Sequence, residues 1–391
     1  MKIAFITSRF PYPLEKGDKL RAFQHIKAMA EKHEVHLFAL SDVAVDEMDL
    51  KKVSEFCSTV NIYRFSKIQV VTNLLKSILN GLPLQVGYFF SESLRKKVFR
   101  DINSANPDLV YCQLIRTALY GHGVDRKKMI DFQDAFVTGT EQRLRRAPWI
   151  LKPIFRRELT KVRQFERTCF DWFDEHLVIS ERDRAEISHP DNLNIKVVPN
   201  GVDTEYYKSV KKSASGKVIL FVGNMNYTPN VDAAEFLVRK IMPMVWSEDP
   251  EVTLNLAGAN PAASVLKLSG PKVNVTGWVD DIRDEYRKAD VFIAPMRIGT
   301  GVQNKIMEAM SMGLPCITTT LSAKPLGAKA GSDLEVGDSA EMLAQKVIQL
   351  LHDKEKATMI AMNGTRFVND NYSVNSMNSL LNECIGGFFK T

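Results

Sequence analysis

Short apolar runs alternate with segments of helical periodicity along the whole chain. Ile3 to Thr7 is the first such run, and Val218 to Val222 starts the pattern again in the second half. This alternation predicts an α/β fold in which parallel sheets carry helices on both faces. Because 391 residues are too many for one typical core, we expect two domains of roughly 150 to 200 residues each.

One strand-turn-helix segment has the pattern of an anion site. It runs from Arg297 to Cys316 and reads RIGTGVQNKIMEAMSMGLPC, directly after the apolar run at 291–295. Gly299 and Gly301 leave little side-chain bulk, so backbone N–H groups can approach a ligand closely. The helix-like run that follows, 302–312, adds unpaired donors and a partial positive charge at its start. The segment therefore predicts a phosphate site.

Two charged residues of this helix share a face. Lys305 and Glu308 are three positions apart, and Glu308 lies about 9 Å from the predicted helix start. That distance is roughly the reach from a diphosphate to the ribose of a nucleotide. Ile306, Met310 and Leu314 form the face expected to be buried. The alternative is a solvated ion pair on an ordinary helix.

The same segment resembles the donor-binding motif of glycosyltransferase family 4, the group 1 sugar transferases. That family carries two glutamates separated by seven residues, and Glu308 in the sequence Glu308-Ala-Met-Ser matches the second of them. Thr300 stands where the first would be, so its hydroxyl or backbone would replace a carboxylate. This departure resembles the exosortase/PEP-CTERM-associated subgroup. The resemblance implies the GT-B fold: two Rossmann-like domains, a cleft between them, and a C-terminal helix that crosses back.

The resemblance also predicts the domain boundaries. The segment at 197–203, VVPNGVD, resembles the family segment that leads from the first domain into the second. We expect an acceptor-side domain at 1–204, a nucleotide-sugar-binding domain at 205–370 and the returning helix at 371–391. The polar, small-residue segment at 208–217 is predicted to be a linker.

A second glycine turn follows the run at 218–222. Most family members carry an arginine and a lysine here that grip the diphosphate, whereas this chain has Asn224 and Asn226. The diphosphate charge would then be met by helix N-termini, Lys305 and Arg297. The resemblance implies these donor-binding residues: Gly17, Gly223, Asn224, Asn226, Arg297, Gly299, Thr300, Gly301, Val302, Gln303, Lys305 and Glu308.

Two further segments of the second half carry expectations. Gly277 to Asp281 resembles the family segment whose backbone holds the nucleotide base, although Trp278 could also be a core residue. Asp280 or Asp281 is expected to cap the next helix. Leu321 to Ser332, with two glycines and a proline, is predicted to be a loop.

The first half has one candidate catalytic residue. Asp134 follows the strand at 129–132 and is the candidate to contact sugar or acceptor, acting as a base; the alternative is that it caps the next helix. Asp131 is expected to make structural hydrogen bonds. Asp18 is predicted to cap the first helix, whose buried face would hold Leu20, Phe23, Ile26 and Ala30.

The segment at 141–167 is strongly basic. It holds nine Lys/Arg and three Glu, a balance of +6 that equals the net charge of the whole chain. Trp149, Ile150 and Ile154 lie among the basic residues, a composition that suits an anionic membrane surface. Nucleic acid is not expected, because no nucleic-acid module accompanies the segment. A solvated basic helix is the alternative.

Cysteine usage and the chain start bear on location. The five cysteines, at 57, 112, 169, 316 and 384, are scattered and odd in number, which predicts buried free thiols in a reducing compartment. Cys/His spacing suited to a metal is absent from the sequence, as is any apolar run of about 18 residues. The run at 2–6 is interpreted as a strand and not a signal peptide. We expect a cytoplasmic protein, docked at the inner face of the membrane, without metal or cofactor.

The resemblance implies a retaining glycosyltransferase. It would take a hexose from a nucleotide diphosphate sugar, for which a UDP-sugar is expected ahead of a GDP-sugar. The acceptor would be a hydroxyl of a lipid-linked glycan or of an exopolysaccharide or lipopolysaccharide precursor. Catalysis would rest on Asp134, Lys305 and Glu308. The alternatives are a nucleotide-sugar epimerase or a phosphorylase on the same fold, and a protein that binds nucleotide sugars without turnover.

Overall fold

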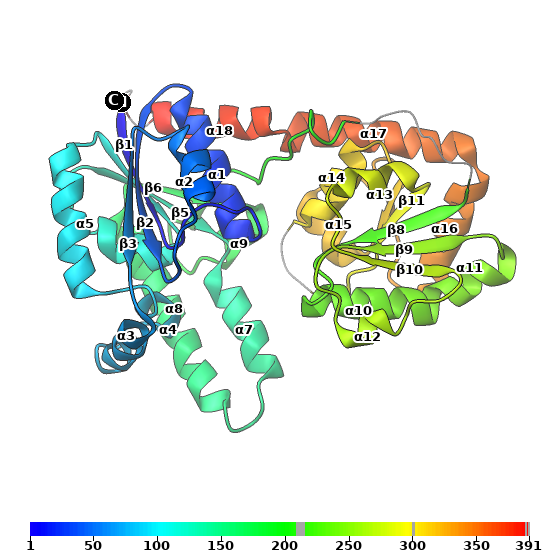
Figure 1. Cartoon of the computed structure of the whole chain (residues 1–391), viewed down its shortest axis with the longest axis horizontal. Coiled ribbons are helices and arrows are strands. Elements are labelled where there is room, and N and C mark those ends of the chain that lie inside the picture. Colours follow the sequence, from blue (N-terminus) through cyan, green and yellow to red (C-terminus); the bar gives the residue numbers. More distant parts are fainter. Residues whose placement is uncertain (209–215, 299–301, 388, 390–391) are drawn as a thin grey trace. The chain divides into compact units, whose positions relative to one another are not determined.

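The computed structural model describes residues 1–208, 216–298, 302–387 and 389. The chain divides into two compact units, one formed by 1–199 with 378–391 and the other by 200–377. Each unit is a parallel sheet with helices on both sides (Figure 1). This confirms the predicted α/β architecture of two Rossmann-like halves. The predicted linker at 208–217 lies largely at 209–215, outside the described residues.

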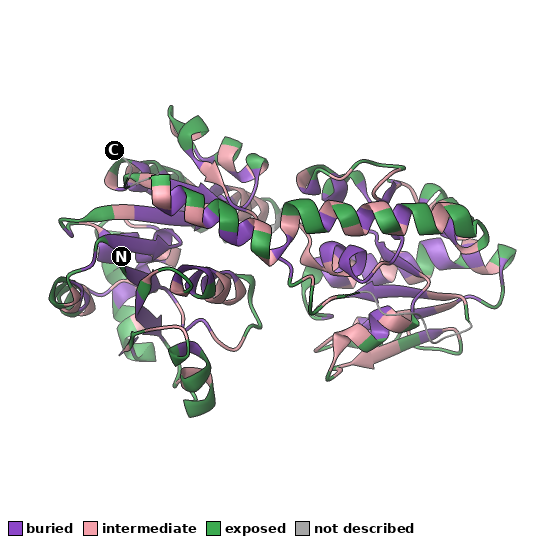
Figure 2. Cartoon of the chain, turned by 90° about the horizontal axis from the view of Figure 1, so that it is seen from above, coloured by how far each residue is buried: buried purple, intermediate pink, exposed green. Residues whose placement is uncertain are grey.

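The first sheet has seven parallel strands in the order β3-β2-β1-β4-β5-β6-β7. Its central strands are buried along nearly their whole length (Figure 2), because helices cover both faces. The strands are β1 (Lys2–Thr7), β2 (Glu34–Ser41), β3 (Thr59–Arg64), β4 (Leu109–Gln113), β5 (Lys127–Gln133), β6 (Glu175–Val178) and β7 (Lys196–Val197).

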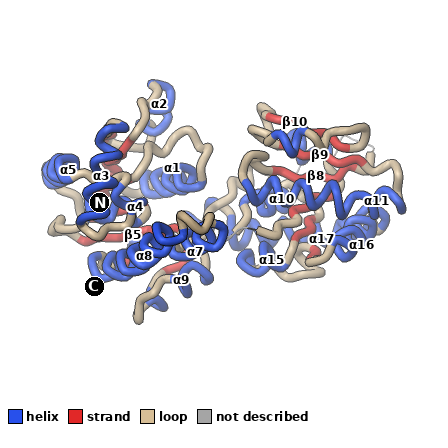
Figure 3. Tube along the Cα trace, turned by 90° about the horizontal axis from the view of Figure 1, so that it is seen from below, coloured by secondary structure: helices blue, strands red, loops and turns tan. Residues whose placement is uncertain are grey.

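Helices of the first unit lie above and below this sheet (Figure 3). They are α1 (Gly17–Ala30), α2 (Glu47–Ser54), α3 (Lys67–Leu79), α4 (Leu84–Gly87), α5 (Glu92–Ala105), α6 (Ala118–Gly121), α7 (Phe136–Arg146), α8 (Lys152–Trp172) and α9 (Glu181–Glu186), with the 3-10 turns η1 (Ile115–Thr117) and η2 (Asn192–Asn194). Ser180, a residue type favoured at helix N-caps, caps α9, since its hydroxyl accepts from the backbone N–H of Asp183 at 3.2 Å.

Helix α1 departs from its prediction in two ways. Lys16 and not Asp18 occupies the N-cap, and Asp18 instead pairs with Arg9. Among the residues that α1 buries are Arg21 and His25. Hydrophobic periodicity missed both, because a polar or charged side chain is buried only where a partner from elsewhere in the fold receives it.

The second sheet has six parallel strands in the order β10-β9-β8-β11-β12-β13. Its core is continuous with the apolar faces of the surrounding helices. The strands are β8 (Val218–Val222), β9 (Thr253–Ala257), β10 (Val273–Gly277), β11 (Val291–Ala294), β12 (Cys316–Thr318) and β13 (Glu335–Val336).

The helices of the second unit include one that was predicted to be a loop. α15 occupies the first half of the predicted loop at 321–332; it buries Ala323 and Leu326, and its C-cap is Gly327, whose φ of 75° is left-handed. The helices are α10 (Thr228–Phe236), the π-turn η3 (Leu237–Ile241), α11 (Met242–Glu248), α12 (Ala263–Leu266), α13 (Ile282–Lys288), α14 (Asn304–Ser311), α15 (Thr320–Leu326), α16 (Ala340–His352) and α17 (Lys354–Tyr372).

The last helix, α18 (Val374–Gly387), begins in the second unit, and its residues from 378 onward belong to the first. Asn378 Nδ2 donates to Glu31 Oε1 at 3.3 Å. Cys384 is buried there, as Cys112, Cys169 and Cys316 are elsewhere, and every cysteine is a free thiol. Among the described helices, none is long and apolar enough to cross a bilayer.

Candidate functional site

Two predicted loops meet at one edge of the second sheet. β8 lies beside β11, with β9 and β10 on its other side, so the strand order reverses between β8 and β11. Ligands of open parallel sheets bind at the carboxyl ends of the strands at such a reversal. The turn from Gly223 to Asn226 follows β8, and the segment that starts at Arg297 follows β11. The structure therefore brings both sequence-predicted loops to the place where a ligand is expected.

The turn after β8 is closely packed. A Cβ added at Gly223 would lie 2.6 Å from Asn230 Nδ2, so only glycine fits there. Asn230 Nδ2 donates to the carbonyl of Asn224 at 2.9 Å, and Asn224 Oδ1 accepts from the backbone N–H of Asn226 at 3.1 Å. Asn224 and Asn226 therefore shape the turn through their backbone and side-chain hydrogen bonds. Asn230, which the sequence analysis missed, holds it in place.

Lys305 connects α14 to this turn. Its ammonium group donates to Asn230 Oδ1 and lies 5.2 Å from the centroid of the Phe221 ring. Burial lowers the pKa of Lys305 to about 8, against the opposing effect of Glu308. A partly desolvated cation at the end of β8 is a strong attractor for an anion, because little water must be displaced before contact.

Glu308 is held by a residue that sequence reasoning missed. The Tyr286 hydroxyl donates to Glu308 Oε2 at 3.0 Å and also contacts the Lys305 carbonyl at 3.4 Å. Burial raises the pKa of Glu308, while the Tyr286 hydrogen bond and Lys305 lower it in part. Tyr286 itself packs edge-on against Tyr207, with ring centroids 6.2 Å apart. Lys305 and Glu308 are thus positioned side chains and not a freely solvated pair. Ile306, Met310 and Leu314 are buried as predicted.

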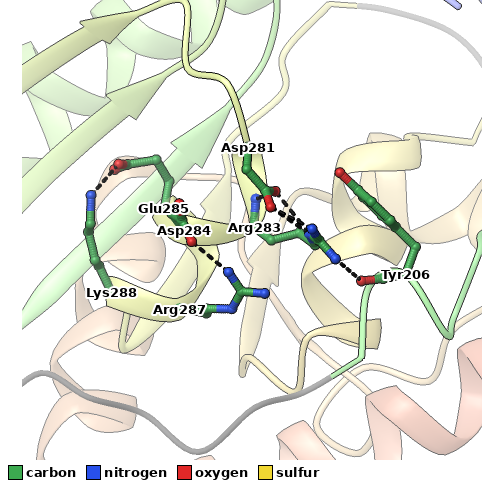
Figure 4. A network of polar contacts seen from close by, with 7 residues as sticks. All are labelled: Tyr206, Asp281, Arg283, Asp284, Glu285, Arg287 and Lys288. Carbon is green, nitrogen blue, oxygen red and sulfur yellow. Dashed lines mark hydrogen bonds and ion pairs between the residues drawn. The ribbon is translucent and has the colours of Figure 1, made fainter.

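The start of α13 fixes the neighbouring loop (Figure 4). Asp281 occupies the N-cap and accepts from the Arg283 backbone N–H at 2.9 Å, which confirms the predicted cap. The Arg283 guanidinium pairs with Asp281 at 2.6 Å and lies 3.8 Å from the Tyr206 ring centroid. Trp278 is 75% exposed, so the alternative that it is a core residue is wrong. Its indole is accessible at the end of β10.

Arg297 and the glycine turn complete the predicted set. The Arg297 guanidinium pairs with Asp232 of α10 at 2.7 Å and lies 4.3 Å from the Phe236 ring centroid, so its charge already has a partner. α14 begins at Asn304, two residues later than predicted, and Gln303 is its N-cap without a side-chain capping bond. Val302 precedes it. The predicted residues Gly299, Thr300 and Gly301 lie outside the described part of the chain.

In the first unit, Asp134 follows β5 with an exposed side chain. The surrounding protein removes part of its hydration, and with nearby Asp183 this raises the pKa of Asp134 to about 6. Ala135 is the N-cap of α7, and the backbone N–H of Phe136 donates to Glu166 Oε1 at 2.6 Å, so the alternative that Asp134 caps the helix is wrong. Gly17 lies close by: a Cβ added there would be 3.9 Å from Gln133 Nε2.

A buried ion pair fixes the turn that carries Asp134. Arg21 Nε and Nη2 donate to the two oxygens of Asp131 at 2.6 and 3.0 Å, and both side chains are fully buried. Asp131 Oδ1 also accepts from the Gln133 backbone N–H at 3.1 Å, and Gln133 has a left-handed φ of 64°. The structural role predicted for Asp131 is confirmed. Within the described residues, no group of three His, Cys, Asp or Glu side chains could hold a metal.

Two Rossmann-like units of this kind define the GT-B class of α/β proteins. Residues 216–353 match the family model for "Glycosyl transferases group 1". The Anabaena protein HepE, crystallised in complex with UDP and glucose, superposes with a TM-score of 0.69 at 15% identity and covers 99% of both chains.

Two sequence relatives add to the comparison. A Klebsiella pneumoniae protein, described as an uncharacterized 44.6 kDa protein in the cps region, is 23% identical over 390 residues, which are 95% of this chain and 96% of the relative. An Escherichia coli UDP-Gal:alpha-D-GlcNAc-diphosphoundecaprenol alpha-1,3-galactosyltransferase is 25% identical over 154 residues, 34% of this chain and 38% of that enzyme. The match to the group 1 glycosyltransferase model, over residues 216–353, agrees with the predicted family. The exosortase-associated subgroup stays a prediction.

Proposed function

We propose that the chain transfers a hexose, with retention of anomeric configuration, from a UDP-sugar to a hydroxyl of a lipid-linked glycan precursor. The observation that carries this proposal is a group of side chains near the carboxyl ends of β8 and β11. Lys305 donates a hydrogen bond to Asn230, and Glu308 accepts one from Tyr286. The group lies within the segment that matches the family model. The UDP in the HepE structure and the diphosphoundecaprenol-linked substrate named for the Escherichia coli relative support the choice of donor and acceptor.

The proposed chemistry is stabilisation of the leaving group. The bond between the anomeric carbon and the diphosphate breaks, and its electron pair stays on the diphosphate oxygen. The Lys305 ammonium and the backbone N–H groups at the start of α14 oppose that growing charge. The acceptor hydroxyl oxygen forms the new bond to the anomeric carbon, and its proton passes to the Asp134 carboxylate.

The decisive experiment uses the full chain, labelled UDP- and GDP-hexoses, and a polyprenyl diphosphate-linked sugar as acceptor. Label should move to the acceptor with UDP-hexose, and NMR should find the donor's anomeric configuration in the product. Conversion of the donor without acceptor would favour the epimerase, and donor affinity without turnover would favour a sensor. Absence of affinity for either nucleotide sugar would remove the proposal.

Glu308→Gln should raise the KM for the donor about tenfold. The charged carboxylate that would accept a hydrogen bond from a ribose hydroxyl is replaced by a neutral amide. Tyr286→Phe should act in the same direction with a smaller effect, since it frees the carboxylate from its 3.0 Å hydrogen bond. Steady-state kinetics at saturating acceptor would measure both. The control Glu355→Gln, at an exposed position of α17, should leave KM unchanged. Unchanged KM in Glu308→Gln would contradict the role given to this residue.

The proposed partner includes an anionic membrane surface at 141–167. This segment covers the second half of α7, the connection and most of α8. Trp149 in the connection is 80% exposed, and Ile150, Leu151 and Ile154 are exposed beside it. An exposed apolar cluster among basic side chains fits the headgroup region of a bilayer. The alternative, a basic helix that packs by its apolar face, leaves these exposed side chains without a role.

Helix α3 extends this surface. It buries the polar residues Asn73 and Ser77 and exposes Ile68, Val71, Leu75, Ile78 and Leu79. The polar face is inward because Ser77 packs on Gly87, where an added Cβ would lie 1.7 Å from the Ser77 hydroxyl oxygen. Arg157 of α8 donates to the carbonyl of Ile78 at 3.2 Å, so α3 and α8 are neighbours. A helix with its apolar face in solvent is best explained by a bilayer that receives it.

The double substitution Leu75→Glu and Trp149→Glu should weaken binding to phosphatidylglycerol vesicles at least about tenfold, because each change removes an apolar side chain from the bilayer boundary. Vesicle sedimentation measures this, with phosphatidylcholine vesicles as the neutral comparison. Met48→Glu, on exposed α2, is the matched control. Equal binding by the wild type and the double variant would contradict membrane docking through this surface.

A further inference from the structure

The first sheet has its own reversal of strand order. β1 lies between β2 and β4, so the order changes direction between β1 and β4. This is the same topological position that the candidate donor group occupies in the second sheet. Arg9 follows the carboxyl end of β1, and Arg116 lies in η1, after the carboxyl end of β4. Two arginines therefore stand where an open parallel sheet binds its ligand.

Aromatic rings hold the two guanidinium groups near each other. Arg9 Cζ lies 5.3 Å and Arg116 Cζ 5.2 Å from the centroid of the same ring, that of Phe89. Arg116 Cζ is also 5.1 Å from the Phe136 ring centroid. Cation–π contact at these distances orients a guanidinium while leaving its N–H groups available. The side chains are only 28% and 17% exposed, so their positions are restricted by the fold.

Positive charge exceeds negative charge at this position. Asp18 pairs with Arg9 through its oxygen Oδ2. The same Asp18 oxygen is 3.7 Å from Arg116 Nη1, a distance too long for a hydrogen bond. Arg116 Nε is buried and finds no hydrogen-bond partner in the described chain. Burial, and then the charges of Arg9 and Arg143, lower the pKa of Arg116 to about 10 despite Asp18. One carboxylate thus serves two arginines, and one guanidinium has donors to spare.

We propose that Arg9 and Arg116 bind a phosphoryl group of the acceptor substrate. Planar guanidinium forks match phosphate oxygens in pairs, and a buried donor without a partner gains most from such a ligand. The inference rests on the proposed function and adds that the acceptor is a diphosphate-linked sugar. The donor's diphosphate has its own cation, Lys305, in the second unit.

The surroundings favour a lipid-linked source for this phosphoryl group. Phe89 follows α4, and Glu158 of α8 accepts from the backbone N–H groups of Leu84 and Gln85 in α4 at 2.7 and 3.2 Å. The phosphoryl site is therefore built on the same helices as the proposed membrane surface. A polyprenyl diphosphate presents its charged group at the bilayer boundary, with the sugar beyond it.

The test compares Arg116→Gln and Arg9→Gln with Arg100→Gln, whose side chain on α5 is 74% exposed. With a prenyl diphosphate-linked sugar, KM for acceptor should rise on the order of 10- to 100-fold in the first two and stay constant in the control. Donor affinity, from titration with UDP, should not change. Inorganic pyrophosphate should compete with acceptor in the wild type and lose this effect in Arg116→Gln.

Three outcomes would overturn the inference. UDP affinity that falls together with acceptor affinity would assign the arginines to the donor. An equal loss of affinity for a phosphate-free alkyl glycoside acceptor would show that the arginines shape the acceptor site without binding a phosphoryl group. Variants that act like the control would leave them no role in binding. In each case wild-type transfer persists, whereas failure of the proposed function would abolish transfer to every acceptor. Comparison of a sugar 1-phosphate with the prenyl diphosphate separates a soluble from a lipid-linked source.

Discussion

Lys305→Ala should lower kcat of sugar transfer about 100-fold or more, while the protein still folds. Removal of one preorganised donor to a developing negative charge has a cost of this size in other enzymes. Lys305 fits that role because its ammonium group is partly desolvated and held on Asn230 at the end of β8. Lys305→Arg should keep more activity than alanine, since it retains the charge with a different geometry. Initial rates at saturating donor and acceptor would measure both.

The pH dependence of donor binding provides a second readout for Lys305. Burial lowers its pKa to about 8, and only the protonated amine attracts a diphosphate. Affinity for UDP should therefore fall about tenfold per pH unit above pH 8 in the wild type and stay nearly flat in Lys305→Arg. Lys240→Ala, at an exposed position, is the control for loss of a lysine. A wild-type rate of turnover in Lys305→Ala would contradict the proposal that Lys305 stabilises the leaving group.

Asp134→Asn should lower kcat/KM about 100-fold, the usual contribution of a positioned base. The pH profile makes the prediction specific. The pKa of Asp134 is raised to about 6, so the wild-type rate should fall about tenfold per unit below pH 6 and level off above it. The asparagine variant should lose this acid limb. Rates between pH 4.5 and 8, with a donor that is stable over that range, would test it.

The same substitution should not destabilise the fold. The folded pKa of Asp134 lies above the value of about 3.9 expected in an unfolded chain, so ionisation above pH 6 works against the folded state. Asparagine removes that charge, and the midpoint of thermal unfolding at pH 7 should stay equal or rise. Asp125→Asn, at an exposed position, is the matched control for rate and stability. A normal rate with an intact acid limb in Asp134→Asn would exclude the residue as a base.

The sequence alone was sufficient for the architecture. Each buried parallel strand reads as a short apolar run, because both of its faces are covered. The alternation of these runs with helical segments is therefore visible along the chain. Caps such as Ser180 and Asp281 were predictable for a similar reason, since the side chain and the N–H it binds lie within three residues of each other. Lys305 and Glu308 stood out because a strand, a glycine turn and a helix follow in sequence.

Only the tertiary structure decided which side chains support those residues. Tyr286 reaches Glu308 from α13, Asn230 reaches Lys305 from α10, and Arg21 reaches Asp131 from α1, each across at least 22 positions of sequence. A charged residue on a helix reads as solvated until the fold supplies its partner, and so Arg21 was missed.

Helix α3 shows that the apolar pattern of a helix does not by itself determine which face is buried. Its exposed stripe of Ile, Val and Leu reads as a core face, but Ser77 on Gly87 turns that stripe outward. Local patterns therefore determine which elements form and where caps and turns fall, since the interacting groups are close in sequence. Which face is buried, and which charge meets which partner, depends on residues far apart in the chain, and these choices are made only when the elements pack.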